Sequence, residues 1–393
     1  MSAPSKHGGE SAGADSLASS LREQRAHEAI ERDFDAHLER IREFLRIPSV
    51  SAADGDLRST ADAVCRLIEA AGGSAEPREG GERRPTVIGV IDGPGPTVLR
   101  YGMYDVQPPG ARWTVEPFAA ELRDGTVIAR GAANSKGALA ASILAFASAP
   151  SPCRQVFVCE GEEELGSPRL AAFCDAHRDE LRADFALDLD LQEDPGSVFA
   201  GVRGLHELEL VAGGGPDVHS SRVADVPAPT LDLARAIVAI KEAVPAANVT
   251  WILAGTPEDA SRTVVAGTAR AGVDLRFLED DGLDAVRAAL PDGVELIVKG
   301  TYPPARSAPD GAPVRALSEA LRRHGTEPKV RPQAPWWAPY HVLGAPFASG
   351  GPGSAGGAHG PDEWASVDGL RTLMHVTYDA IALLAGGDGR TEP

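Results

Sequence analysis

Three acidic residues follow directly on an apolar stretch of this sequence. Glu162, Glu163 and Glu164 come after "RQVFVCEG" at 154–161, which has the composition of a buried strand. A run of charges is usually a solvated surface. Here, however, the carboxylates follow an apolar strand, and proteins with parallel sheets bind ligands at the carboxyl ends of their strands. This position favours carboxylates that take part in chemistry.

Further side chains that could belong to the same site come at the ends of other apolar stretches, near the start of an expected helix or in a glycine-rich loop. They are Met103, Asp105, Asn134, Asp188, Asp190 and His359. Closely spaced carboxylates are unfavourable without a positive counter-charge, and carboxylate and imidazole groups are ligands of divalent cations. The sequence therefore predicts a divalent cation site. Met103 is unexpected in such a site, because a thioether is a poor ligand for zinc.

The elements that must position these side chains alternate between strands and helices. Two helical patterns, near 34–45 and 59–72, come first. This order predicts an α/β fold with a largely parallel sheet and helices on both faces. The expected strands are 86–92, 97–103, 154–160 and 185–191, and the expected helices between them are 136–147 and 168–176.

A different order of elements follows Gly204. The pattern β-α-β-β-α-β is that of a ferredoxin-like α+β unit. Its expected strands are 205–212, 249–254, 268–279 and 294–300, and its helices are 229–245 and 282–290. The α/β pattern then returns. We therefore expect a disordered tail over 1–25, a catalytic α/β domain over 26–204 and 311–393, and an inserted lid domain over 205–310.

The overall composition excludes several classes of partner. A formal net charge of −19 on 393 residues disfavours nucleic acid and anionic membranes, because both require clustered Lys and Arg. No apolar stretch approaches the roughly 18–20 residues that span a bilayer, and the first residues lack the apolar core of a secretory signal. We therefore expect a cytoplasmic protein. Its four cysteines show no CxxC spacing and are expected to be reduced and buried.

Eight short motifs, taken together, resemble those of one enzyme family. They are "YGMYDVQP", "WTVEPF", "ARGAANSKG", "EGEEELGS", "DLDL", "GVRG", "DVHSS" and "GGAHGPDE". In this order they resemble the co-catalytic zinc peptidases that include carnosinase-like dipeptidases, aminoacylases and carboxypeptidase G. The resemblance covers about residues 30 to 385. It implies a zinc-exopeptidase-like catalytic domain, a lid through which subunits form a homodimer, and a small amino-acid-derived substrate.

The resemblance also implies roles for individual residues. Glu163 matches the general base that takes a proton from the attacking water, and Glu164 matches a metal ligand. Asp190 and His359 match two further metal ligands. Asp105 matches a carboxylate that orients a ligand histidine without touching the metal.

Two positions depart from the family pattern, and both belong to the metal site. Met103 stands where the family has a zinc-binding histidine, and Asn134 stands where it has the aspartate that bridges two zinc ions. The site thus loses an imidazole and one negative charge. A neutral amide is a weak bridge between two cations, so we expect one divalent cation, zinc or manganese, or none. Glu164, His359 and the Asn134 carbonyl remain to hold it.

Other matched residues point to the substrate. His219, in "DVHSS", matches a lid histidine that stabilises the oxyanion in the partner subunit's site. Arg276 matches a lid arginine that binds the substrate carboxylate. Trp336 and Trp337 replace a compact polar loop of the family. They either pack in the core or at the dimer contact, or line a pocket for an aromatic, apolar or cationic group.

Three functions remain open at this point. The first is hydrolysis of a dipeptide or N-acyl amino acid with a one-metal site. The second is a non-hydrolytic or metal-independent step, such as acyl transfer or rearrangement of an amino-acid-derived metabolite, with Glu163 as acid and base. The third is a catalytically inactive binding homologue. The retention of Glu163, His219, Arg276 and His359 favours an enzyme.

Overall fold

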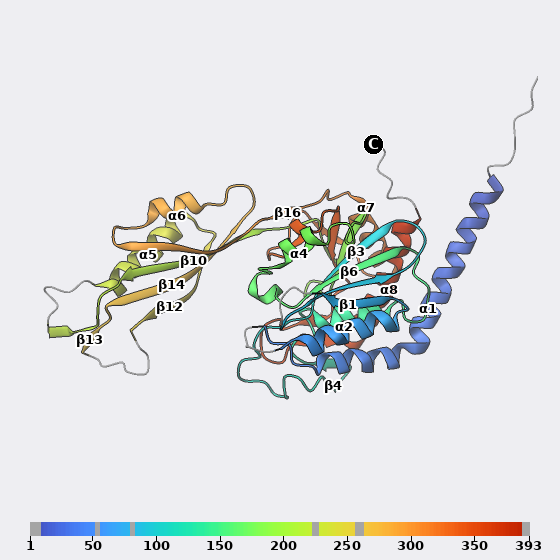
Figure 1. The fold of residues 1–393 in the computed structure, drawn as a ribbon, viewed down its shortest axis with the longest axis horizontal. Coiled ribbons are helices and arrows are strands. Elements are labelled where there is room, and N and C mark those ends of the chain that lie inside the picture. The colour runs from blue at the N-terminus through green and yellow to red at the C-terminus, as the bar shows by residue number, and fades with distance from the viewer. Residues whose placement is uncertain (1–8, 52–55, 79–82, 222–227, 256–262, 387–393) are drawn as a thin grey trace, which may run out of the picture. The chain divides into compact units, whose positions relative to one another are not determined.

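The computed structural model describes residues 9–51, 56–78, 83–221, 228–255 and 263–386. Its contacts divide the chain into two compact units (Figure 1). Unit 1 comprises Met1–Gly201, Arg306–Gln333 and Pro339–Pro393, and unit 2 comprises Val202–Ala305 and Ala334–Ala338. The sequence placed these boundaries at 204/205 and 310/311. The segment 334–338, which contains both Trp336 and Trp337, was expected in the catalytic domain but belongs to unit 2.

Unit 1 is built on an eight-stranded sheet. The order is β1-β2-β6-β3-β7-β18-β8-β17. The four central strands β6, β3, β7 and β18 are parallel, whereas β1 and β2 on one side and the β18–β8 pair on the other are antiparallel. The sheet is therefore mixed, and the predicted parallel arrangement holds for its centre. The bounds are β1 Ser74–Arg78, β2 Thr86–Ile91, β3 Thr97–Met103, β6 Arg154–Glu160, β7 Phe185–Leu189, β8 Ser197–Phe199, β17 Lys329–Arg331 and β18 Phe347–Gly350.

Helices cover this sheet with apolar faces. Helix α2 packs on β1 and β2, α7 packs on β18, β7 and α8, and α1, α3 and α8 contact one another. The buried face of α1 includes Ile30, Phe34, Ile41 and Leu45, at the spacing of one helical face. The bounds are α1 Gly9–Leu45, α2 Arg58–Ala70, α3 Lys136–Leu144, α4 Leu170–Ala176, α7 Ala312–Arg323 and α8 Val367–Ala385. None of the described helices combines the length and the apolar character needed to cross a membrane.

Helix α1 begins earlier than expected. Residues 9–25 were predicted to belong to a disordered tail, but the helix extends from Gly9 through this region to Leu45. Elongating an existing helix needs no new nucleus, so each added residue gains a hydrogen bond at low cost. The segment is also tied to the rest of the unit, because Glu23 pairs with Arg323 at the end of α7. The polar composition of residues 9–25 therefore did not prevent them from forming a helix.

A second, smaller sheet in unit 1 supports the loops that carry functional side chains. Its order is β19-β20-β5-β4, with bounds Ala355–Gly356, Trp364–Ser366, Thr126–Ile128 and Glu121–Arg123. The loop from β5 to α3 contains Asn134, and the turn between β19 and β20 contains His359. Because β5 and β20 pair directly, these two segments start from adjacent strands.

Unit 2 has the predicted β-α-β-β-α-β order. Its four-stranded sheet has the order β12-β14-β10-β15, and all neighbouring pairs are antiparallel, which is the ferredoxin-like arrangement. Helices α5 and α6 pack on an apolar core that includes Leu210, Leu233, Ile240 and Val286. The bounds are β10 Gly204–Gly213, α5 Pro229–Ala243, β12 Ala247–Ala254, β14 Thr268–Phe277, α6 Leu283–Ala289 and β15 Val294–Tyr302.

Candidate active site

The carboxyl ends of three adjacent parallel strands bring the predicted residues together. Strand β3 ends at Met103, which lies beside Glu160 at the end of β6, and β7 on the other side leads to Asp190. A single 3-10 turn, η1 (Glu163–Leu165), follows β6 and carries Glu163 and Glu164. Met103 is buried, with 7% of its surface exposed. The carboxyl ends of β6, β3 and β7 thus lie at one edge of the sheet in unit 1.

Asp105 fixes the turn that carries the two glutamates. Its side chain is fully buried, and its two oxygens accept hydrogen bonds from the backbone N–H groups of Glu163 (3.2 Å) and Glu164 (3.1 Å). Burial, together with the nearby Glu160 and Glu164, raises the pKa of Asp105 well above its usual range. The residue that would orient a histidine in the family therefore orients η1 here.

Asn134, Glu164 and His359 form a close triangle. The Asn134 Nδ2 lies 3.0 Å from Glu164 Oε1 and 2.7 Å from His359 Nε2. His359 Nε2 and Glu164 Oε1 are 3.2 Å apart. The hydrogen bond to Glu164 is the main reason why the pKa of His359 is raised. Gln107 Nε2 donates to the other oxygen of Glu164 at 2.8 Å, so this carboxylate is held at both oxygens.

Asp190 lies beside a second polar group. Its Oδ2 is 3.0 Å from the Ser135 hydroxyl, which also lies 3.0 Å from Asn134 Oδ1, and its Oδ1 accepts from the backbone N–H of Leu191 at 2.7 Å. Desolvation, with Asp188 as the nearest like charge, raises the pKa of Asp190 well above its usual range. Ser135 therefore links Asp190 to the Asn134 amide, a contact that the sequence did not predict.

Glu163 differs from its neighbour Glu164. Within the described part of the chain, its carboxylate neither accepts a hydrogen bond nor pairs with a cation. Its pKa is raised well above the usual range, first by desolvation and then by the carboxylates of Glu164 and Asp105. A carboxyl group whose pKa is raised and whose oxygens make no hydrogen bond within the described residues is suited to exchange a proton with a reacting group.

A buried ion pair supports the two loops behind this triangle, and the sequence reasoning missed it. Arg130 (1% exposed) and Glu363 (0% exposed) form a charge-assisted hydrogen bond. Glu363 Oε1 also accepts from the backbone N–H groups of Gly131 (3.1 Å), Ala133 (2.9 Å) and Asn134 (2.8 Å). Arg130 Nη2 donates to the carbonyl of His359 at 3.1 Å. Arg130 lies in the motif "ARGAANSKG" and Glu363 lies in "GGAHGPDE". Their presence in these motifs is the feature of the sequence that could have pointed to them.

Two more carboxylates, the buried Glu160 and the half-buried Asp188, lie near the carboxyl ends of β6 and β7. Glu160 accepts hydrogen bonds at 2.8 Å from both the Tyr101 and Ser167 hydroxyls, and desolvation raises its pKa to about 7. Asp188 accepts a short hydrogen bond from Tyr340, and desolvation raises its pKa to about 6. These groups extend the acidic character of the site into the core, and the sequence did not assign a role to Glu160 or Tyr340.

The raised pKa of Glu160 predicts a pH-dependent stability. Ionisation of this buried carboxyl is unfavourable, so its cost is absent below about pH 4.5 and grows until the pH passes about 7. We expect Glu160→Gln, which keeps an acceptor for Tyr101 and Ser167, to remove this cost. The gain should be about 3 kcal/mol at pH 8 relative to pH 4.5. Urea unfolding of both proteins at the two pH values measures it. An equal difference between them at both pH values would contradict the assignment.

Unit 2 contains the remaining predicted residues. Arg276 and Trp336 line one cavity of about 550 Å³ together with Arg203, Asn248 and Asp274. The Arg276 guanidinium bonds Asp274 at 2.9–3.1 Å. A substrate carboxylate would therefore compete with a carboxylate of the protein for this side chain.

The other two predicted residues of unit 2 lie elsewhere. Trp337 is only 9% exposed; its indole N–H donates to the Pro303 carbonyl at 3.1 Å and its ring packs on Tyr302. These contacts are those of a core residue. His219 is exposed at the end of the short strand β11 (Val218–His219), where its Nδ1 lies 2.9 Å from the Ser221 hydroxyl.

Comparison with known proteins places the chain in a family. Residues 100–383 match the model of peptidase family M20/M25/M40. The structure is similar to an M20 family metallo-carboxypeptidase from Sulfolobus solfataricus, with a TM-score of 0.80 and 24% identity over 89% of this chain and 99% of that one. It is also similar to human carnosine dipeptidase 1, with a TM-score of 0.78 and 16% identity over 93% and 99%.

A sequence relative supports the same assignment over a shorter region. The succinyl-diaminopimelate desuccinylase of Rhodospirillum centenum is 36% identical over 113 residues, which are 27% of this chain and 28% of that protein. The matched region thus spans less than a third of the relative's length. The fold is that of a zinc-exopeptidase-like catalytic domain. The chain belongs to peptidase family M20/M25/M40.

Proposed function

We propose that the protein hydrolyses the amide bond of a dipeptide or an N-acyl amino acid, with a site that accepts no more than one divalent cation. One observation carries the proposal. Glu164, His359 and Asn134 place side-chain atoms 2.7–3.2 Å from one another. Glu163, whose carboxylate has no partner among the described residues, precedes Glu164 in the same turn. Membership of a peptidase family supports hydrolysis as the reaction.

The triangle fits one ion. Zinc ligands at 2.0–2.2 Å from a tetrahedral centre stand roughly 3.3 Å apart, close to the separations within the triangle. Turning the Asn134 amide over would direct its oxygen toward Glu164 and His359 and its Nδ2 toward Ser135. The three ligands would then be a carboxylate, an imidazole and an amide oxygen. Manganese suits the same set, because it accepts oxygen ligands readily.

The remaining residues do not fit a second ion. The Met103 thioether is a poor zinc ligand, and both oxygens of Asp190 already accept hydrogen bonds, from Ser135 and from the Leu191 backbone. Glu164 and Asp190 together supply two negative charges. This charge balances one divalent cation and leaves a second uncompensated.

Each residue of the proposed site would have a separate role in hydrolysis. A divalent cation, when bound, would polarise the carbonyl of the scissile amide. Glu163 would take a proton from the attacking water and pass it to the leaving amine. His219 of the partner subunit would donate to the oxyanion, and Arg276 would bind the substrate carboxylate. Trp336 would contribute an aromatic wall to the same pocket as Arg276.

A second candidate function has its own support. As the triangle stands, the Asn134 amide donates to Glu164 and faces His359, which satisfies both groups without an ion. The same site would then work as a metal-independent acid and base for acyl transfer or rearrangement, again through Glu163. A binding protein without activity is the third alternative.

One experiment separates these alternatives. The full chain is stripped with a chelator, then assayed on a panel of dipeptides and N-acyl amino acids with and without zinc or manganese. We expect turnover only with metal, and one metal equivalent fewer in His359→Ala than in the unmodified chain. Met103→His combined with Asn134→Asp, which restores the family ligands, should gain one equivalent. Two equivalents lost in His359→Ala would contradict the one-ion site, and metal-independent turnover would favour the second function.

Unit 2 also supports the proposed homodimer. Strand β12 lies at the edge of its sheet, and it exposes Val249, Trp251, Ile252 and Leu253, with Ile252 60% exposed. An apolar edge strand of this kind readily pairs with another chain. We propose that a second copy of the protein covers it, and the mass of the purified protein in light scattering tests this. A small amino-acid-derived substrate and a cytoplasmic location remain predictions from the sequence.

A further inference from the structure

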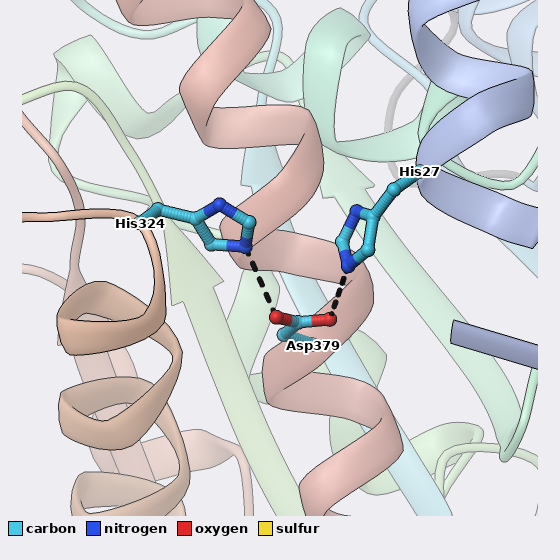
Figure 2. A group of neighbouring side chains, drawn as sticks. All are labelled: His27, His324 and Asp379. Carbon is cyan, nitrogen blue, oxygen red and sulfur yellow. Dashed lines mark hydrogen bonds and ion pairs between the residues drawn. The ribbon is translucent and has the colours of Figure 1, made fainter. Parts of the chain in front are cut away.

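A cluster of imidazoles and carboxylates lies where helices α1, α7 and α8 meet in unit 1. His27 comes from α1, His324 follows the last turn of α7, and Asp379 comes from α8 (Figure 2). All three side chains point toward one another. His375 on α8 and Glu31 on α1 extend the cluster. None of these residues belongs to the candidate active site, and none carries one of its motifs.

The ligand atoms of three of these residues have the spacing of a metal site. His27 Nε2 lies 2.9 Å from Asp379 Oδ1, and His324 Nε2 lies 3.0 Å from Asp379 Oδ2. All three ligand atoms lie within 4.8 Å of one another, and in the described part of the chain no other group of three His, Cys, Asp or Glu residues does so. Zinc bonds of about 2.0–2.2 Å span such separations without large movement.

The hydrogen bonds around His27 require one donor more than neutral side chains supply. Three contacts run in a chain, from Asp379 to His27 Nε2, from His27 Nδ1 to His375 Nδ1 (2.7 Å), and from His375 Nε2 to Glu31 Oε1 (2.7 Å). Both ends of the chain are carboxylates, which only accept. Two neutral imidazoles carry two N–H groups for three contacts. The chain is therefore complete only with an additional proton or with a cation at one end.

A cation at His27 Nε2 completes the chain. It replaces the hydrogen bond between His27 and Asp379, so that His27 Nδ1–H donates to His375 and His375 Nε2–H donates to Glu31. Metal-binding histidines characteristically donate their second N–H in this way, which fixes the ring and its tautomer. The arrangement of His375 and Glu31 is thus the one that a metal-bound His27 needs.

The surroundings allow an ion to enter. A surface cavity of about 730 Å³ is lined by these ligands and by Glu23, Glu28 and Glu31, so solvent can reach the cluster and supply a further ligand. One positive charge opposes binding, because Arg323 Nη1 lies 3.9 Å from Asp379 Oδ2. That guanidinium also pairs with Glu23 at 3.1 Å and with Glu319 at 3.8 Å, which balances its charge.

We propose that His27, His324 and Asp379 bind a divalent transition-metal ion of the zinc type, at a site separate from the active site. Two imidazoles and one carboxylate favour zinc over magnesium or calcium, which prefer oxygen ligands alone. The ion fastens the first helix of the chain to α7 and α8. Its role is structural, and zinc should therefore raise the temperature of unfolding.

The test uses the full chain with His359→Ala, so that the active-site ion does not contribute. After removal of metal, this protein is titrated with zinc alone, and with cobalt as a visible-absorption probe. We expect one zinc equivalent, and at least about 100-fold weaker binding in His324→Ala, because even partners outside the ligand shell account for 10–100-fold in metal sites. The zinc-dependent rise in unfolding temperature should disappear as well.

A matched control is available at His177. Like His324 it stands at the C-cap of a helix, is half-buried and pairs with a carboxylate, in this case Glu180. His177→Ala should bind zinc as its parent does. Asp379→Asn, nearly isosteric, provides a second ligand variant if His324→Ala folds poorly. Zinc binding that is absent from the parent, or unchanged in both ligand variants, would overturn the proposal. So would an X-ray absorption spectrum of the zinc-loaded parent without imidazole ligands.

Discussion

Glu163→Gln is expected to lower kcat by about 100- to 10,000-fold, which is the usual contribution of a general base. Glutamine has almost the same size and lacks the ability to accept a proton. The backbone of Glu163 is held by Asp105, and its side chain makes no hydrogen bond within the described residues, so the fold should be preserved. The measurement is steady-state turnover of whichever substrate the dipeptide and N-acyl amino acid panel identifies.

The neighbouring Glu162 provides the control for this substitution. Its carboxylate pairs with Arg169 and Arg84 and belongs to none of the contacts around Asn134 and His359. Glu162→Gln should therefore retain turnover within a few-fold. Activity that is equally reduced in both variants would point to a disturbed turn instead of a lost base. Unchanged activity in Glu163→Gln would remove the residue from the mechanism.

Glu363→Gln is expected to destabilise the protein by about 3–5 kcal/mol, because it leaves the buried guanidinium of Arg130 without its counter-charge. Neither side chain reaches solvent, so water cannot replace the lost partner. The substitution should also reduce turnover, since Glu363 holds the backbone of Asn134 and Arg130 holds that of His359. Chemical unfolding monitored by circular dichroism measures the loss of stability.

An exposed ion pair on β4 of the small sheet provides the comparison for Glu363. Glu121 pairs with Arg123, and both side chains are more than 40% exposed. Because exposed pairs contribute about 0–1 kcal/mol, Glu121→Gln should shift the unfolding free energy by no more than this. If Glu363→Gln behaved like Glu121→Gln, the buried pair would not be the support that its geometry indicates.

Much of the fold could be predicted from the sequence, because its signals were local. The apolar runs that end at Met103 and Glu160 formed the expected strands, and the β-α-β-β-α-β order of unit 2 followed from periodicity. The antiparallel edges of the large sheet were not predicted, because strand direction depends on partners far away in the chain. The helix before residue 25 was missed for a similar reason, since its contact with Arg323 is distant in sequence.

The candidate site was predicted less completely than the fold. Residue types and motif order identified Asn134, Glu164 and His359 as candidate ligands. In the structure these three side chains are in contact. The support by Glu363 was not predicted, because a carboxylate that binds backbone N–H groups leaves no spacing pattern. Ser135 was missed for the same reason, because its role depends only on the contacts of its hydroxyl with Asn134 Oδ1 and Asp190 Oδ2.

Glu363 binds backbone groups of the loop that contains Asn134, and not the Asn134 side chain. It accepts hydrogen bonds from three backbone N–H groups of this loop, those of Gly131, Ala133 and Asn134. The shape of this loop is therefore independent of which side chain residue 134 has. Under the proposed function, a single substitution at residue 134 can therefore change a metal ligand while the loop keeps its path. The number of ions that such a site holds can then change without any change in the fold.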